Sequence, residues 1–217
     1  MRVFVTGASG HIGSVVVREL IQAGHQVLGL ARSDTSAALI ASAGADVHRG
    51  TLEDLDSLRS GVLATDAVIH LAFDNAALRT DFAAAAQSEL RAVETMGAAL
   101  EGSGKPFVST SGTLSVAMLG RLATEDDASN SASPRVVSEN TVIALAEHGV
   151  RSSIIRLAPS VHSNAEKHGF IPTLIRIARA KGVSGYVGDG SNRWPAVHLL
   201  DAAHLYRLAL ESAPAGS

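Results

Sequence analysis

The first thirteen residues, MRVFVTGASGHIG, constrain the fold of this chain more than any other stretch. An apolar run at Val3–Val5 stops at Thr6, and glycines follow at positions 7, 10 and 13. Helix-periodic apolar residues come next, at Val15, Val16 and Leu20. This order predicts a strand, a tight turn and a helix.

Each of the three glycines has a physical role in such a turn. Gly7 can take the positive φ of a sharp turn, Gly10 lets the backbone approach a pyrophosphate, and Gly13 lets the helix pack closely on the strand. The first N–H groups of the helix then face phosphate oxygens. The alternative is a loop whose glycines serve only the turn. Because the pattern follows a strand and opens a helix, we predict a dinucleotide site made by Gly7, Ser9, Gly10, His11, Ile12 and Gly13.

Further apolar runs alternate with helix-like segments rich in Ala, Leu, Glu and Arg. The runs are Gln26–Leu30, Ala45–His48, Ala67–Leu71, Pro106–Thr110 and Ser152–Leu157. The alternation predicts an α/β fold with a doubly wound, Rossmann-type parallel sheet over residues 1–160. Ligands of such sheets bind beyond the carboxyl ends of the strands.

Residues 161–217 break this rhythm and are expected to form a small substrate-side lobe packed on the sheet domain. The pattern predicts a helix over Ile171–Lys181, a glycine-rich turn, a strand at Trp194–His198 and a last helix through Leu210. The tail, Ala213–Ser217, is expected to fray.

Composition excludes several classes of function. The net charge is −3 and no basic cluster occurs, which argues against a nucleic-acid partner. The chain has no cysteine, so it has neither disulfides nor thiolate metal sites. No apolar run approaches the ~20 residues of a membrane span, and the first strand leaves no room for a signal peptide. We therefore expect a cytoplasmic protein with a small-molecule partner and no membrane partner, compatible with a homodimer.

The residue about 20 positions past the last glycine indicates the cofactor. Enzymes that use NAD usually carry an Asp or Glu there, whereas this chain has Arg32. A guanidinium cannot accept a hydrogen bond from a ribose hydroxyl, but it can pair with the 2′-phosphate of NADP, with the Ser33 hydroxyl as a second donor. The rival is Asp34, which either reaches the ribose or caps the following helix. Capping is the simpler role, so the sequence predicts NADP rather than NAD.

The spacing Thr6-Gly-x-x-Gly-x-x-Gly13 resembles that of extended and atypical short-chain dehydrogenases/reductases, the NAD-dependent epimerase/dehydratase-like group. The likeness covers nearly the whole chain. It implies that the segment around Leu52 lies along the adenine, and that Leu71, Ala72 and Phe73 lie along the ribose and pyrophosphate. The alternative for Leu52 and Phe73 is a plain core position.

The same resemblance implies further cofactor contacts and a lobe that this chain does not finish. It implies contacts at Thr110 and at the backbone from Pro159 to Val161, beside the nicotinamide. It implies that His70 braces a turn rather than acting as a base. Family members continue for several dozen residues, so the lobe is expected to be incomplete. No metal is expected, because His162, His168 and His198 lack a matching carboxylate spacing.

The catalytic residues of the resemblance are only partly present. Ser111 matches the family's serine at the end of the fifth strand. The alternative is that Ser111 belongs to a run of small hydroxyl residues that ends the strand and has no catalytic role. The family's Tyr and Lys, four residues apart on one helix face, are absent, because neither Tyr186 nor Tyr206 has Lys at +4. Counting back from Arg156, which resembles the arginine that ends the family's sixth strand, places Arg135 at the Lys and Ser131 at the Tyr. A gap of one helical turn would instead place Arg135 at the Tyr and Glu139 at the Lys, and neither choice restores a phenol.

Three charged residues are candidates to replace the missing pair. The simplest interpretation of Arg135 is that it forms an exposed ion pair with Glu139, four residues further on. Alternatively, Arg135 makes the contact with the cofactor ribose that the family's lysine makes. Glu89 falls at the family's active-site Asn, and with Asp74 it is a candidate for handling protons. We therefore expect an NADP-dependent oxidoreductase or epimerase-like enzyme acting on a carbonyl or hydroxyl group. The alternative is a non-catalytic protein that senses the NADP redox state.

Overall fold

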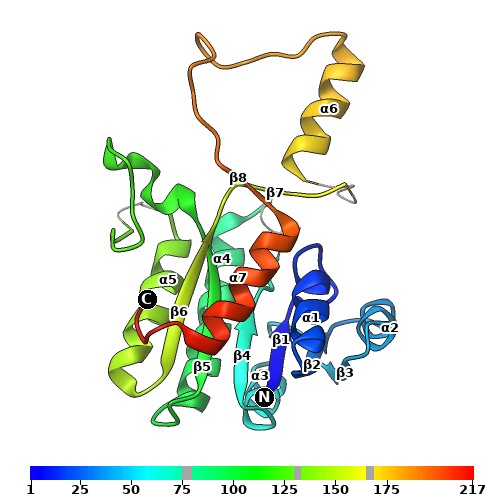
Figure 1. Cartoon of the computed structure of the whole chain (residues 1–217), viewed down its shortest axis with the longest axis vertical. Helices are drawn as coiled ribbons and strands as arrows, with labels where there is room; N and C mark the ends of the chain where they lie inside the picture. The colour runs from blue at the N-terminus through cyan, green and yellow to red at the C-terminus, as the bar shows by residue number, and fades with distance from the viewer. Residues whose placement is uncertain (75–79, 130–132, 165–168) are drawn as a thin grey trace.

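The computed structural model describes residues 1–74, 80–129, 133–164 and 169–217 (Figure 1). Its centre is a six-stranded sheet in the order β3-β2-β1-β4-β5-β6, with every neighbouring pair parallel. This order confirms the Rossmann-type sheet. Successive strands extend the sheet to one side from β1 to β3, and from β4 onward they extend it to the other side, so the switch point lies between β1 and β4. The strands are β1 (Arg2–Thr6), β2 (Gln26–Ala31), β3 (Asp46–Arg49), β4 (Ala67–His70), β5 (Pro106–Gly112) and β6 (Arg151–Leu157).

Helices cover both faces of the sheet, and each face has its own apolar core. On one face lie α1 (Gly13–Gln22), α2 (Asp34–Ser42) and α7 (Leu199–Ser212). On the other lie α3 (Leu55–Leu63), α4 (Phe82–Leu100) and α5 (Arg135–Ala144). The short helices η2 (Thr113–Leu119) and η3 (Leu145–His148) follow β5 and α5. Because both faces are covered, β1 and β4 are almost continuously apolar, as buried parallel strands are.

The expected strands agree with the structure to within two residues, and the differences matter at β5. That strand continues past Thr110 to Gly112, so Ser111 lies in the sheet opposite Arg156 of β6.

The tail does not fray as expected. Gly216 N donates to Ser152 O at 2.8 Å and Ile154 N donates to Ser217 O at 2.7 Å. The reason is that β6 is an edge strand whose outer N–H and C=O groups need partners.

The segment between β6 and α7 leaves the sheet domain. Strands β7 (Ser160–His162) and β8 (Ala196–His198) form a separate parallel pair. Between them α6 (Phe170–Lys181) and the following loop stand away from the sheet (Figure 1). No described residue of α6 is buried, and its Phe170 ring stacks on Trp194 with centroids 4.7 Å apart. Among the described helices none has the length and apolarity to cross a membrane.

Candidate functional site

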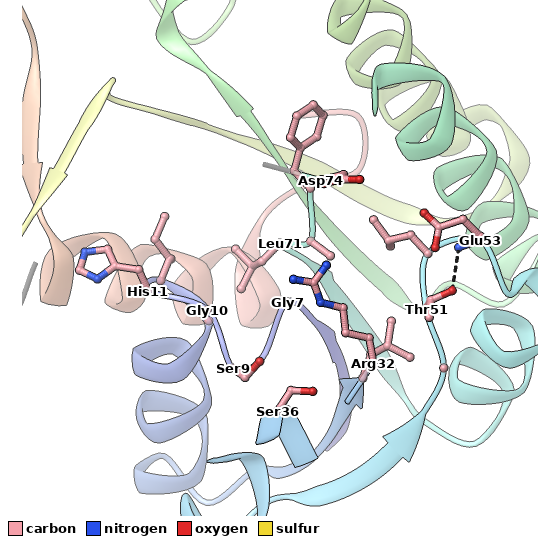
Figure 2. A pocket seen from close by; sticks show the side chains of 17 residues that line it. Gly7, Ser9, Gly10, His11, Arg32, Ser36, Thr51, Glu53, Leu71 and Asp74 are labelled. Carbon is pink, nitrogen blue, oxygen red and sulfur yellow. Dashed lines mark hydrogen bonds between the residues drawn. The ribbon is translucent and has the colours of Figure 1, made fainter. Parts of the chain in front are cut away.

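A cavity of about 630 Å³ opens at the carboxyl ends of β1, β2 and β4 (Figure 2). Eleven of the expected cofactor residues line it: Gly7, Ser9, Gly10, His11, Ile12, Gly13, Arg32, Leu52, Leu71, Ala72 and Phe73. Asp74 lines it as well. Gly50, Thr51 and Glu53, from the segment expected along the adenine, line it too, and so do Leu30 and Ser36, which the sequence patterns did not single out. Their positions in the sequence could have indicated this, since these residues flank the ends of β2 and β3.

The glycine turn is built as the spacing requires. Gly7 has φ +69°, and a Cβ there would lie 2.9 Å from the backbone N of Ala72. A Cβ on Gly13 would lie only 2.0 Å from Gly7 O, so the start of α1 packs directly on the turn. No side chain caps this helix, because Ile12 stands at the N-cap. Its first N–H groups and its positive dipole end are therefore available to an anion in the cavity.

Thr6 and His70 hold the turn against the end of β4. The Thr6 hydroxyl accepts from the backbone N–H groups of Leu71 and Ala72, both at 3.2 Å, and bonds His70 Nδ1 at 2.7 Å. Burial, reinforced by the charge of Arg135, lowers the pKa of His70 to about 3. His70 is therefore neutral near pH 7, and its bond to Thr6 fits the bracing role expected for it.

The end of β2 presents a guanidinium to the cavity. Figure 2 shows the Arg32 side chain directed inward, near Ser36. Two expectations here were wrong. Ser33 does not line the cavity but caps α2, accepting from Ser36 N at 3.2 Å, because it stands at the N-cap position itself. Asp34 neither caps α2 nor lines the cavity, and it pairs with Arg49 at 2.7 Å.

Arg135 does not form the expected exposed pair with Glu139. Its Nε and Nη2 donate to the two carboxylate oxygens of Glu89 at 3.0 and 2.8 Å, and Nη2 also donates to Thr110 O at 3.1 Å. Its Cζ lies 4.3 Å from the ring centroid of Phe73, which lines the cavity. The pairing differs because α5 packs against α4 and turns both carboxylates inward.

Glu89 is a buried carboxylate, 3% exposed. Burial raises the pKa of Glu89 above its ordinary value, although the hydrogen bonds and charge of Arg135 act in the opposite direction. A carboxyl group with a raised pKa is suited to proton transfer near neutral pH.

Ser111 belongs to a second buried cluster. Its hydroxyl donates to Glu139 Oε2 at 2.5 Å. The other carboxylate oxygen accepts from Arg156 Nη2 at 2.6 Å and from Ser129 Oγ at 2.5 Å. From the sequence Glu139 was expected as a surface partner of Arg135 or, with a shift of one helical turn, at the family's Lys position, and neither expectation indicated the contact with Ser111.

The remaining expected residues lie elsewhere. Thr110, Pro159 and Val161 do not line the cavity. Thr110 Oγ1 donates to His70 O at 2.9 Å and lies 2.7 Å from the Tyr206 hydroxyl. Ser131 and His168 lie outside the described residues. No group of three or more metal-ligating side chains occurs within the described ranges.

We expect Arg135→Met to destabilise the fold by about 3 kcal/mol at pH 7.5, because it leaves the Glu89 carboxylate buried without its partner. A folded-state pKa above the unfolded one gives stability that is present at low pH and lost as the pH rises through the folded pKa. The loss should therefore be smaller at pH 5 than at pH 7.5, because protonation relieves an unpaired, buried Glu89 as the pH falls. Urea unfolding at both pH values measures it. Arg91→Met, on the exposed side of α4, is the control, and an equal loss at both pH values would contradict this role of Glu89.

Comparisons with known proteins agree with this geometry. The family model described as "NAD dependent epimerase/dehydratase family" matches residues 3–217. An uncharacterized protein of Schizosaccharomyces pombe is 47% identical over 221 residues, covering 100% of this chain and 73% of that protein. A 4-hydroxy-2-methyl-3-oxo-4-farnesyl-3,4-dihydroquinoline-1-oxide ketoreductase of Stigmatella aurantiaca is 27% identical over 223 residues, covering 100% of this chain and 66% of that protein. The fold is similar to that of the Thermus thermophilus UDP-glucose 4-epimerase in complex with NAD, with TM-score 0.77 and 22% identity, covering 99% of this chain and 76% of that one.

Proposed function

Because the chain belongs to the NAD dependent epimerase/dehydratase family, we propose that it binds NADP(H) and transfers hydride to or from the carbonyl or hydroxyl carbon of a small molecule. The observation that carries the cofactor choice is Arg32, directed into the cavity beside Ser36. A guanidinium suits a 2′-phosphate, whereas Asp34, the acid two residues further on, pairs with Arg49 and does not line the cavity. The Thermus thermophilus epimerase carries NAD, so the preference for NADP rests on Arg32 itself.

The bound nicotinamide supplies or accepts the hydride, and the chain supplies the positioning. The glycine turn and the start of α1 hold the pyrophosphate, and Leu52 and Phe73 border the adenine and ribose regions. Arg135 has five N–H donors, of which those on Nε and Nη2 serve Glu89 and Thr110. Its Nη1 group is the one we assign to the cofactor ribose. Thr110, Pro159 and Val161 remain proposed contacts of the nicotinamide end.

Ser111 is the residue we assign to the substrate oxygen, at the carboxyl end of β5. The proton handling that the family gives to a tyrosine needs another group here, and the sequence offers Glu89 and Asp74 as candidates. The Stigmatella ketoreductase supports a carbonyl compound as substrate, since its name describes reduction of a keto group.

A second function, binding NADP(H) as a redox sensor without turnover, is favoured by the places of the two tyrosines. Tyr206 is fully buried in the core beside α1, and burial raises its pKa. Tyr186 is 77% exposed in the loop after α6. Neither side chain lines the cavity.

Incubation of the protein with NADPH and a panel of ketones, aldehydes and nucleotide sugars separates the two functions. We expect saturable NADPH oxidation with at least one carbonyl compound. Ser111→Ala should lower kcat/KM about tenfold, since one hydrogen bond to the reacting oxygen is lost. Tight NADPH binding without turnover across the panel would support the sensor instead.

A further inference from the structure

We propose that Glu139 is the proton acceptor behind Ser111, so that the pair Ser111–Glu139 performs the proton transfer for which the chain has no phenol. This inference rests on the proposed function, because it concerns the step that accompanies hydride transfer. It differs from the candidates Glu89 and Asp74, since the Ser111 hydroxyl donates to Glu139, whereas Glu89 is paired with Arg135.

The first ground is the direction of the Ser111 hydrogen bond. A serine hydroxyl has one proton, and here it is donated to Glu139 Oε2 at 2.5 Å. The lone pairs of Ser111 Oγ are then the groups available to a ligand. Such an oxygen accepts a hydrogen bond from an alcohol, which is the arrangement needed to remove the proton of a substrate hydroxyl.

The second ground is the environment of the carboxylate. The Glu139 side chain is fully buried, and its Oε1 accepts from Arg156 Nε at 2.9 Å and Nη2 at 2.6 Å, and from Ser129 Oγ. Burial by itself would raise the pKa of Glu139, but the hydrogen bonds from Ser111, Ser129 and Arg156 together lower it below its ordinary value. Glu139 is therefore ionised at neutral pH, and its Oε2 keeps a lone pair directed at the Ser111 proton. Arg156 from β6 is the charged group facing it, while Arg135 of its own helix is engaged by Glu89 of α4.

The third ground is the position of the pair relative to the cavity. Phe73 lines the cavity, the Arg135 guanidinium covers its ring, and Arg135 also bonds Thr110 O, one residue before Ser111. Ser111 does not itself line the cavity, and it directly follows the residue whose carbonyl holds this arginine. Its backbone is fixed by the pairing of β5 with β6, opposite Arg156.

The step balances without a further reactant. In alcohol oxidation the carbon-bound hydrogen leaves as hydride to the bound NADP⁺, and the carbonyl π bond forms from the O–H electron pair. The hydroxyl proton moves to Ser111 Oγ as the Ser111 proton moves to Glu139 Oε2. Reduction runs the same transfers backward, and Glu139 must then first receive a proton from solvent in each turnover.

The test compares wild type, Glu139→Gln and Glu139→Asp in the alcohol-oxidation direction. We expect Glu139→Gln to lower kcat at least about tenfold with KM for the alcohol within about twofold, because a base is lost and a binding group is not. Glu139→Asp keeps a carboxylate and should recover part of kcat. Glu147→Gln, the same change on the exposed turn η3, should leave kcat unchanged. Each variant's NADPH affinity serves as the check that its site has folded.

The pH profile separates proton transfer from a structural role. Wild-type kcat should be flat from pH 6 to 8, whereas Glu139→Gln should rise by up to about tenfold per pH unit, because hydroxide then takes the Ser111 proton. In the protein without cofactor, infrared difference spectra between wild type and Glu139→Gln at pH 7 should show a carboxylate band.

The outcomes distinguish this inference from the function on which it rests. If the wild type is active and Glu139→Gln leaves both kcat and its pH profile unchanged, the role of Glu139 is wrong and the proposed enzymatic function stands. A carboxylic-acid band at pH 7 would also overturn this role of Glu139. A wild type that binds NADPH without turnover would overturn the inference together with the proposed enzymatic function.

Discussion

Replacing Gly10 with valine is expected to weaken NADPH binding about 100-fold or more while leaving the fold intact. A Cβ at this position meets only Gly7 O, at 3.1 Å, so the turn needs a shift of a few tenths of an ångström. The rest of the valine side chain would occupy the cavity that Gly10 lines, where the pyrophosphate has to approach the backbone. The measurement is a calorimetric titration with NADPH, with circular dichroism as the check on folding.

Gly185→Val is the matched control for this variant. Gly185 has open space around a built Cβ and lies in the exposed loop after α6, away from the cavity. NADPH affinity should be unchanged in the control. A folded Gly10→Val protein that binds NADPH within about threefold of wild type would place the dinucleotide somewhere other than at the glycine turn.

Replacing Arg32 with alanine is expected to weaken NADPH binding about 10- to 100-fold and NADH binding by less than about threefold. A charge-assisted hydrogen bond to a phosphate contributes ~1.5–3 kcal/mol, and NADH has no 2′-phosphate with which to form one. Titration of both dinucleotides into wild type and variant gives the four dissociation constants needed.

Arg59→Ala controls for the general loss of positive charge. Arg59 lies on the exposed side of α3 and does not line the cavity. It should change the two affinities little and equally. If Arg32→Ala weakened NADH as much as NADPH, the guanidinium would not be the selective contact.

The sheet and its helices were predictable because their signals are local and repeated. The glycine turn follows a strand and opens a helix, and buried parallel strands such as β4 give unbroken apolar runs. Eleven of the fifteen expected cofactor residues line the cavity for the same reason, since they sit at strand ends in sequence.

The charged groups of the site were predicted less well because their partners are far apart in the chain. The i, i+4 spacing of Arg135 and Glu139 suggested one exposed pair, whereas Arg135 binds Glu89, 46 residues away, and Glu139 binds Ser111, 28 residues away. Ser33 was misassigned for a local reason, since capping α2 and reaching a phosphate use the same hydroxyl. Only the packing of α5 on α4 and β5 decides between such partners.

Calorimetric titration of the unaltered protein with NADPH and with NADH tests the central claim most directly. We predict saturable binding of both dinucleotides at one site, with NADPH at least about tenfold tighter, the equivalent of ~1.4 kcal/mol. The absence of heat with either dinucleotide, or NADH binding as tight as NADPH binding, would contradict the claim that the glycine turn and Arg32 together hold a 2′-phosphorylated dinucleotide.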